Sequence, residues 1–179
     1  MGSRIILPYL NSDEYIQKIV PSDSVFLNVK LPTFDEYEIN PVLDLPDDIG
    51  SEVKTAIEQQ YNEWYSWFTS PEDIRKCLAP IVGTGWDIFS NTPILYFPKF
   101  TPILDENTVS IHNNKENLIL MGAQINQLHI TDFIDFFRTI PEICNYLNLN
   151  EDDIINNPSN IGYHPIFGLR IIDYGLYNT

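Results

Sequence analysis

The chain has 179 residues, of which 44% are hydrophobic and 20% charged, so it can bury a substantial core and is too apolar for a disordered tail. No apolar run approaches the ~18 residues that a membrane helix needs, and two cysteines are too few for a disulfide framework. The first residues lack the long apolar stretch and the small-residue cleavage site that are typical of a signal peptide. With 25 acidic and 10 basic residues the net charge is −15, which disfavours direct binding to nucleic acid or to an anionic membrane. We therefore expect a cytoplasmic protein that folds without a cofactor.

The first thirty residues predict two extended segments on either side of a short helix. Residues 4–10 contain three successive aliphatic residues and read as a strand or an extended arm. Ser12 is a suitable N-cap for a helix that runs to Val20 and is ended by Pro21. Residues 24–29 alternate as a strand does.

The segment 31–53 contains no Lys or Arg, and its acidic residues alternate with large apolar ones. Prolines interrupt it at three positions, so much of it is expected to be loop or edge strand. Two interpretations stay open. Either the apolar residues pack inward and leave the acids in solvent, or the segment is an acidic, aromatic docking surface.

The clearest predicted helix begins between Asp47 and Ser51 and ends near Thr69. Five apolar residues recur at intervals of four, four, three and four, which indicates one helix face: Val53, Ile57, Tyr61, Trp64 and Phe68. The polar residues are expected to lie mostly off this face, among them Glu58, Gln59, Asn62 and Glu63. Trp67 points elsewhere, so it packs under a second layer or is exposed as an interface residue.

The rest of the chain predicts alternating helices and strands without a βαβ pattern. Ser70 and Pro71 fit the N-cap and first position of a short helix, and two glycines at 83 and 85 suggest a turn. Short, proline-bounded strands are expected at 94–104, a hairpin at 108–121 and a strand at 124–130. Two helices, from Thr131 and Asn150, and a final strand over 167–174 complete the chain. The fold class is therefore α+β, with helices packed on a mostly antiparallel sheet in a single compact domain over residues 1–179.

No catalytic motif or metal site can be assigned from the sequence. His129-Ile130-Thr131 fits the His-x-Thr pair of two-histidine phosphodiesterases, but no second pair exists. Residues 148–159 begin like a calcium loop but lack its central Gly and final Glu. Cys77 and Cys144 lie on predicted apolar faces and read as buried, inert thiols.

We therefore expect a non-enzymatic acidic binding protein that occludes a basic, nucleic-acid-handling surface of a partner protein. An immunity protein that neutralises a nuclease toxin and a phage inhibitor of a defence complex both fit this description. The expected partner-binding residues are Asp35, Glu36, Tyr37, Glu38, Asp44, Asp47, Asp48 and Trp67. Two alternatives stay open: an enzyme whose site joins distant histidines (His112, His129, His164) to carboxylates, and a viral structural or assembly subunit.

Overall fold

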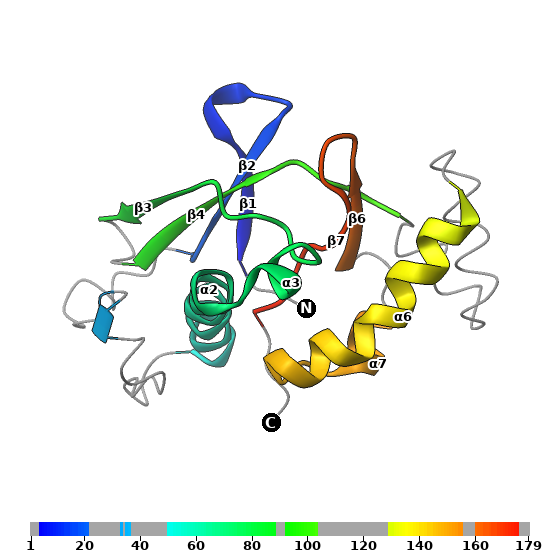
Figure 1. Ribbon diagram of the computed structural model, residues 1–179. Helices are drawn as coiled ribbons and strands as arrows, with labels where there is room; N and C mark the ends of the chain where they lie inside the picture. The colour runs from blue at the N-terminus through cyan, green and yellow to red at the C-terminus, as the bar shows by residue number, and fades with distance from the viewer. Residues whose placement is uncertain are drawn as a thin grey trace. The chain divides into compact units, whose positions relative to one another are not determined.

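The computed structural model describes most of the chain (Figure 1), namely residues 4–21, 33, 35–36, 50–88, 92–103, 129–155 and 160–175. The chain divides into two compact units. Unit 1 comprises Met1–Ser70 and Pro80–Lys99, and unit 2 comprises Pro71–Ala79 and Phe100–Thr179. Each unit combines helices with an antiparallel sheet, so the predicted α+β class is confirmed. The expectation of a single domain over the whole chain stays a prediction.

The sheet of unit 1 has four antiparallel strands in the order β1-β2-β4-β3. The strands are β1 (Ile5–Pro8), β2 (Tyr15–Ile19), β4 (Thr92–Pro98) and β3 (Gly83–Asp87). A 3-10 turn, η1 (Tyr9–Asn11), joins β1 to β2 in a hairpin. The helix predicted from Ser12 to Val20 is wrong, because β2 is paired with β1 on one side and β4 on the other, and these ladders outweigh the local capping signal.

The central strand β4 contains two prolines, although prolines had indicated edge strands. Pro93 and Pro98 stand near the two ends of the strand, opposite Trp86 and Tyr15, so the ladder between them is kept. The two glycines predicted to turn the chain lie in β3 instead. They leave room for a neighbouring ring, since a Cβ added at Gly85 would lie 3.2 Å from the Tyr96 hydroxyl.

Helix α2 (Ser51–Thr69) packs on this sheet against β4 (Figure 1). Val20, Ala56, Ile57 and Tyr61 form the core of the unit and are fully buried. The predicted stripe is confirmed at its centre but wrong at its end, where Phe68 is 43% exposed.

The polar side of α2 departs from the sequence expectation, because Gln59, Gln60 and Glu63 are all fully buried. Gln60 has a clear reason to be inside: its amide donates to the carbonyls of Lys18 (2.7 Å) and Pro93 (2.8 Å) and so ties α2 to β2 and β4. The amide of Gln59 has no hydrogen-bond partner in the described structure.

Unit 2 has a three-stranded antiparallel sheet in the order β5-β6-β7. Its elements are α3 (Glu72–Arg75), β5 (Thr101–Pro102), α6 (Ile130–Leu147), α7 (Glu151–Ile155), β6 (Ile161–His164) and β7 (Gly168–Ile171). Helix α3 begins one residue later than predicted, with Pro71 as N-cap. The Asn150 cap is confirmed, because its side-chain oxygen accepts the N–H of Asp152 at 3.0 Å.

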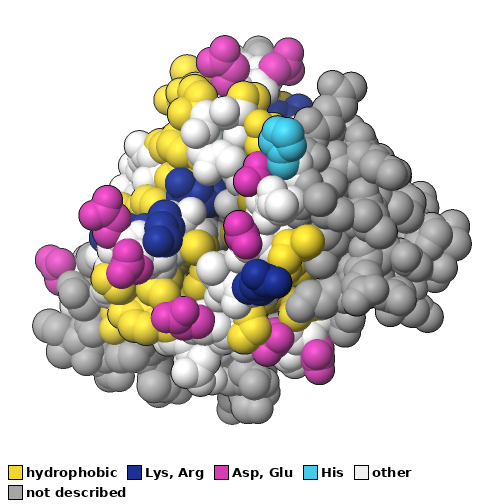
Figure 2. Space-filling model, turned by 45° about the vertical axis from the view of Figure 1, so that its right-hand side comes forward, with side chains coloured by type: hydrophobic (Ala, Val, Ile, Leu, Met, Phe, Trp, Pro, Cys, Tyr) yellow, Lys and Arg dark blue, Asp and Glu magenta, His cyan; other side chains and the backbone are white. Residues whose placement is uncertain are grey.

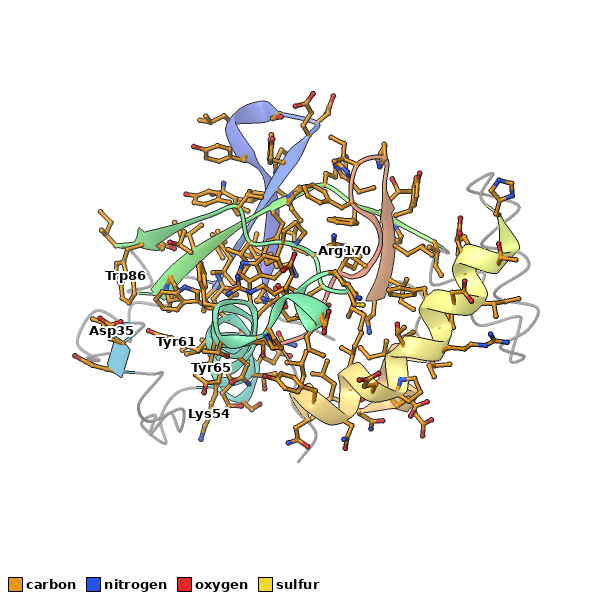
Figure 3. All side chains as sticks on the ribbon, viewed as in Figure 1. Asp35, Lys54, Tyr61, Tyr65, Trp86 and Arg170 are labelled. Carbon is orange, nitrogen blue, oxygen red and sulfur yellow. The ribbon has the colours of Figure 1, made fainter. Side chains whose placement is uncertain are left out.

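Arg170 connects the final strand to the region of α3 (Figure 3). Its guanidinium donates to three backbone carbonyls, those of Arg75 (3.0 Å), Leu78 (2.9 Å) and Phe167 (3.2 Å). Partial burial lowers the pKa of this arginine, which stays charged because the ordinary value is so high. The side chain therefore replaces water as the donor to carbonyls at the end of a short helix.

Some predictions fall on residues outside the described ranges: the strand at 24–29, the hairpin at 108–121 and nearly all of the strand at 124–130.

Cys77 and Cys144 are free and buried, as predicted, and burial raises the pKa of both thiols. Among the helices that are described, none is both long and apolar enough to cross a membrane.

Candidate protein-binding surface

Acidic and basic side chains are partitioned very differently between surface and interior. Among the described residues, thirteen Asp or Glu are exposed against three Lys or Arg. The exposed acids are Asp13, Glu14, Asp35, Glu36, Glu52, Glu72, Asp73, Asp132, Asp135, Glu142, Glu151, Asp152 and Asp153, and the exposed bases are Lys76, Lys99 and Arg138. Two of these bases lie near a carboxylate one helical turn away, Lys76 at 3.8 Å from Asp73 and Arg138 at 3.9 Å from Asp135. The surface is thus more acidic than the composition alone requires.

Two of the basic residues that are not exposed, Arg4 and Lys18, surround one buried carboxylate in unit 1. Arg4 donates to both oxygens of Glu63, at 3.1 and 3.0 Å, and to the Gln60 side-chain oxygen at 3.2 Å. Lys18 donates to Glu63 at 2.7 Å and lies 4.6 Å from the centre of the Phe97 ring. The three charged side chains are 0–4% exposed. This cluster holds β1 and β2 against α2 through bonds that water does not screen.

The buried carboxylate has a strongly displaced pKa. Burial alone raises the pKa of Glu63, but the charges and hydrogen bonds of Arg4 and Lys18 outweigh it and lower the pKa from 4.5 to about 2. Since the folded value lies below the unfolded one, ionised Glu63 stabilises the fold above about pH 5.

We expect this stabilisation, about 3 kcal/mol, to disappear as the pH falls from 5 towards 2. Urea unfolding of the wild type and of Glu63→Gln, followed by tryptophan fluorescence at pH 6, 4, 3 and 2, measures it. The difference between the two proteins isolates Glu63 from the other carboxylates, because they are common to both. A difference that stays constant over this range would contradict the assignment.

The predicted site residues are only partly described. Asp35 and Glu36 are helical and exposed, and Figure 3 shows Asp35 clear of α2. Trp67 is half-buried on α2, between the two alternatives that its position had left open. Tyr37, Glu38, Asp44, Asp47 and Asp48 lie outside the described residues, so their roles stay predictions.

A second group of acids lies on the helices of unit 2. Three of them follow one face of α6 at intervals of three and seven residues, and three more occupy the first turn of α7: Asp132, Asp135, Glu142, Glu151, Asp152 and Asp153. Tyr146 on α6 is 54% exposed. Four of these acids (Glu142, Glu151, Asp152 and Asp153) fall in a second stretch of the sequence without Lys or Arg, between Arg138 and Arg170, which is the sequence signal for them.

Two of the three histidines that the enzyme alternative would require lie in the described residues. His129 is the exposed N-cap residue of α6, and the Nδ1 of His164 accepts the N–H of Ile166 at 3.0 Å. His112 lies outside the described residues, so a convergence of all three stays a prediction. In the described ranges, no three His, Cys, Asp or Glu side chains come together as a metal ion requires.

The face drawn in Figure 2 shows how these charges are distributed. Acidic side chains (magenta) are scattered over this face, and hydrophobic side chains (yellow) and a few Lys or Arg side chains (dark blue) are exposed between them. Such a mixture differs from a purely solvated acidic surface, because it offers apolar contact as well as charge.

No family model matches the chain, and no curated protein or solved structure is significantly similar to it.

Proposed function

We propose that this chain is a non-enzymatic, acidic binding protein of the cytoplasm that docks on a basic surface of a partner protein. The surface it covers would be one that handles nucleic acid, and its carboxylates would take the place of phosphates. Binding would block the partner by occlusion, as an immunity protein or a phage anti-defence inhibitor does.

One observation carries this proposal: thirteen exposed carboxylates stand against three exposed bases in the described structure. Charges of one sign steer a partner of the opposite sign and raise the association rate. A basic surface that holds nucleic acid already has the complementary charge. The two buried thiols fit a reducing compartment such as the cytoplasm, because neither is in a disulfide.

The residues proposed to contact the partner begin with Asp35 and Glu36, whose side chains are exposed. Tyr37, Glu38, Asp44, Asp47, Asp48 and Trp67 complete the proposed set on the strength of the sequence. The contribution of each exposed carboxylate is expected to be small by itself, so the effect depends on their number.

The test is capture followed by competition. The tagged full chain retains proteins from a nuclease-treated lysate of its native host, and the retained partner is purified. We expect that partner to bind a fluorescent 20-base-pair DNA or RNA duplex, and the chain to displace this duplex. Association should slow by roughly tenfold between 50 and 200 mM NaCl, since screening weakens steering.

The double variant Asp35→Lys/Glu36→Lys locates the effect. It should slow association more than Asp152→Lys/Asp153→Lys, which changes the net charge equally on unit 2. Equal slowing by both pairs would contradict the proposed site, whereas salt-insensitive binding or a partner that holds the chain and the duplex together would contradict the function.

A further inference from the structure

We infer that the β1–η1–β2 hairpin is an apolar anchor that inserts into a hydrophobic groove on the same basic partner. The inference rests on the proposed function and adds to it the surface that supplies affinity. Leu10 at the tip of the hairpin is the residue expected to enter the groove.

Exposed hydrophobic side chains are concentrated on this hairpin. Of the twelve large hydrophobic residues exposed in the described structure, half lie within eleven residues of sequence: Ile5, Ile6, Leu7, Tyr9, Leu10 and Tyr15. Their exposed fractions range from 37% for Tyr9 to 80% for Leu10. Figure 1 shows the loop of the hairpin standing clear of the other strands of its sheet. Such a concentration of exposed hydrophobic residues marks an interaction site more often than a solvated loop.

The pattern of β1 fits a strand that is covered on both faces. Ile5, Ile6 and Leu7 follow one another, so they point to opposite faces of the sheet. Each of them is nevertheless at least 39% exposed, because β1 is an edge strand with β2 as its only described neighbour. An exposed apolar edge favours association, and no charged side chain protects it within Ile5–Pro8.

The tip is held in a strained conformation. Leu10 has φ 50° and ψ 38°, in the left-handed region that side chains other than Gly, Asn and Asp rarely adopt. Two interactions support the turn: the Ser12 N–H donates to the Tyr9 carbonyl at 2.8 Å, and the centre of the Tyr9 ring lies 4.7 Å from that of Tyr96 in an edge-to-face arrangement. A strained and exposed leucine in a hydrogen-bonded turn is typical of a residue that is ordered in advance for binding.

Charge favours a basic partner, rather than a second copy of the chain, as the protein that binds the hairpin. Arg4, which directly precedes β1, and Lys18 in β2 are directed inward to Glu63, and their side chains are 3% and 4% exposed. The exposed charges of the hairpin are therefore Asp13 and Glu14, next to the apolar tip. Two copies would each bring a net charge of −15 and repel one another, whereas a basic groove is attracted.

Leu10→Asn separates binding from stability. Asparagine tolerates the left-handed conformation, so the urea midpoint of tryptophan fluorescence should stay the same or rise. The affinity for the captured partner should fall by roughly tenfold or more, as expected for an anchor residue. Ile166→Asn is the matched control, because Ile166 is 83% exposed on unit 2, and it should change the affinity by less than about twofold.

The outcomes distinguish this inference from the proposed function. If Leu10→Asn leaves the affinity unchanged while Asp35→Lys/Glu36→Lys weakens it, the anchor is wrong and the function stands. If the full chain sediments as a dimer that Leu10→Asn dissociates, the occupant is a second copy and the anchor to a basic partner is overturned. A benzophenone photo-crosslinker at position 10 should link the chain to that partner, and a crosslink only within the chain would also overturn it.

Discussion

Replacing Glu63 by Gln is expected to lower the free energy of unfolding of unit 1 by about 3–5 kcal/mol at pH 7. The glutamine is similar in size, but it removes the negative charge that Arg4 and Lys18 share. Its amide nitrogen would also face one of their N–H donors. Two cations would then be buried with their described carboxylate partner gone, which is among the most costly changes in a protein interior.

Tryptophan fluorescence reports this result specifically, because all three tryptophans, at 64, 67 and 86, belong to unit 1. Glu58→Gln on the same helix is the control: Glu58 is half-buried and should change stability by less than about 0.5 kcal/mol. If Glu63→Gln does not fold, an apolar set, Arg4→Leu with Lys18→Met and Glu63→Leu, should restore the fold, since packed hydrophobic residues often replace a buried charge cluster without loss. Equal effects of Glu58→Gln and Glu63→Gln would contradict the role of the cluster.

Replacing Arg170 by Met is expected to destabilise unit 2 by about 2–4 kcal/mol. Methionine retains most of the apolar stem but leaves the carbonyls of Arg75, Leu78 and Phe167 without this donor. Through these carbonyls, Arg170 connects the region of α3 to the turn before β7, so both regions should become less stable when the donor is removed. Hydrogen exchange of peptides from 72–79 and 161–171 measures the change.

Arg138→Met is the matched control for this experiment. Arg138 is exposed on α6 and lies 3.9 Å from Asp135, so its loss should cost less than about 0.5 kcal/mol. Similar acceleration of exchange in both variants would show that Arg170 acts through its charge alone rather than through the three carbonyls.

The stability and the proposed binding of this protein are linked through the same few bases. Arg4 and Lys18 are buried on Glu63, and the partly buried Arg170 donates to backbone carbonyls. Because these basic side chains are not exposed, the surface is acidic, and the exposed charges of the hairpin are Asp13 and Glu14. A variant that loosens the Glu63 cluster is therefore expected to disturb the hairpin as well, which is why Leu10→Asn is the better probe of binding.

Local pattern was sufficient to predict the fold class and several elements. The four-and-three spacing of apolar residues located α2, and the Asn150 cap located α7, because both signals depend only on nearby residues. The acidic character and the two buried thiols also follow from the sequence. These features require no knowledge of which distant segments meet.

Tertiary structure alone decided the features on which the functional inference depends. Ser12 signals a helix cap, yet β2 is a strand because it pairs with the adjacent β1 in a hairpin and with β4, which is about 80 residues away in the sequence. Glu63 reads as a surface residue of α2, and only the approach of Arg4 and Lys18, 59 and 45 residues away in sequence, makes its burial favourable. The sequence therefore determined how many charges the protein carries, whereas the fold decided which of them face solvent, because desolvating a charge is tolerable only where a partner of opposite sign is brought to it.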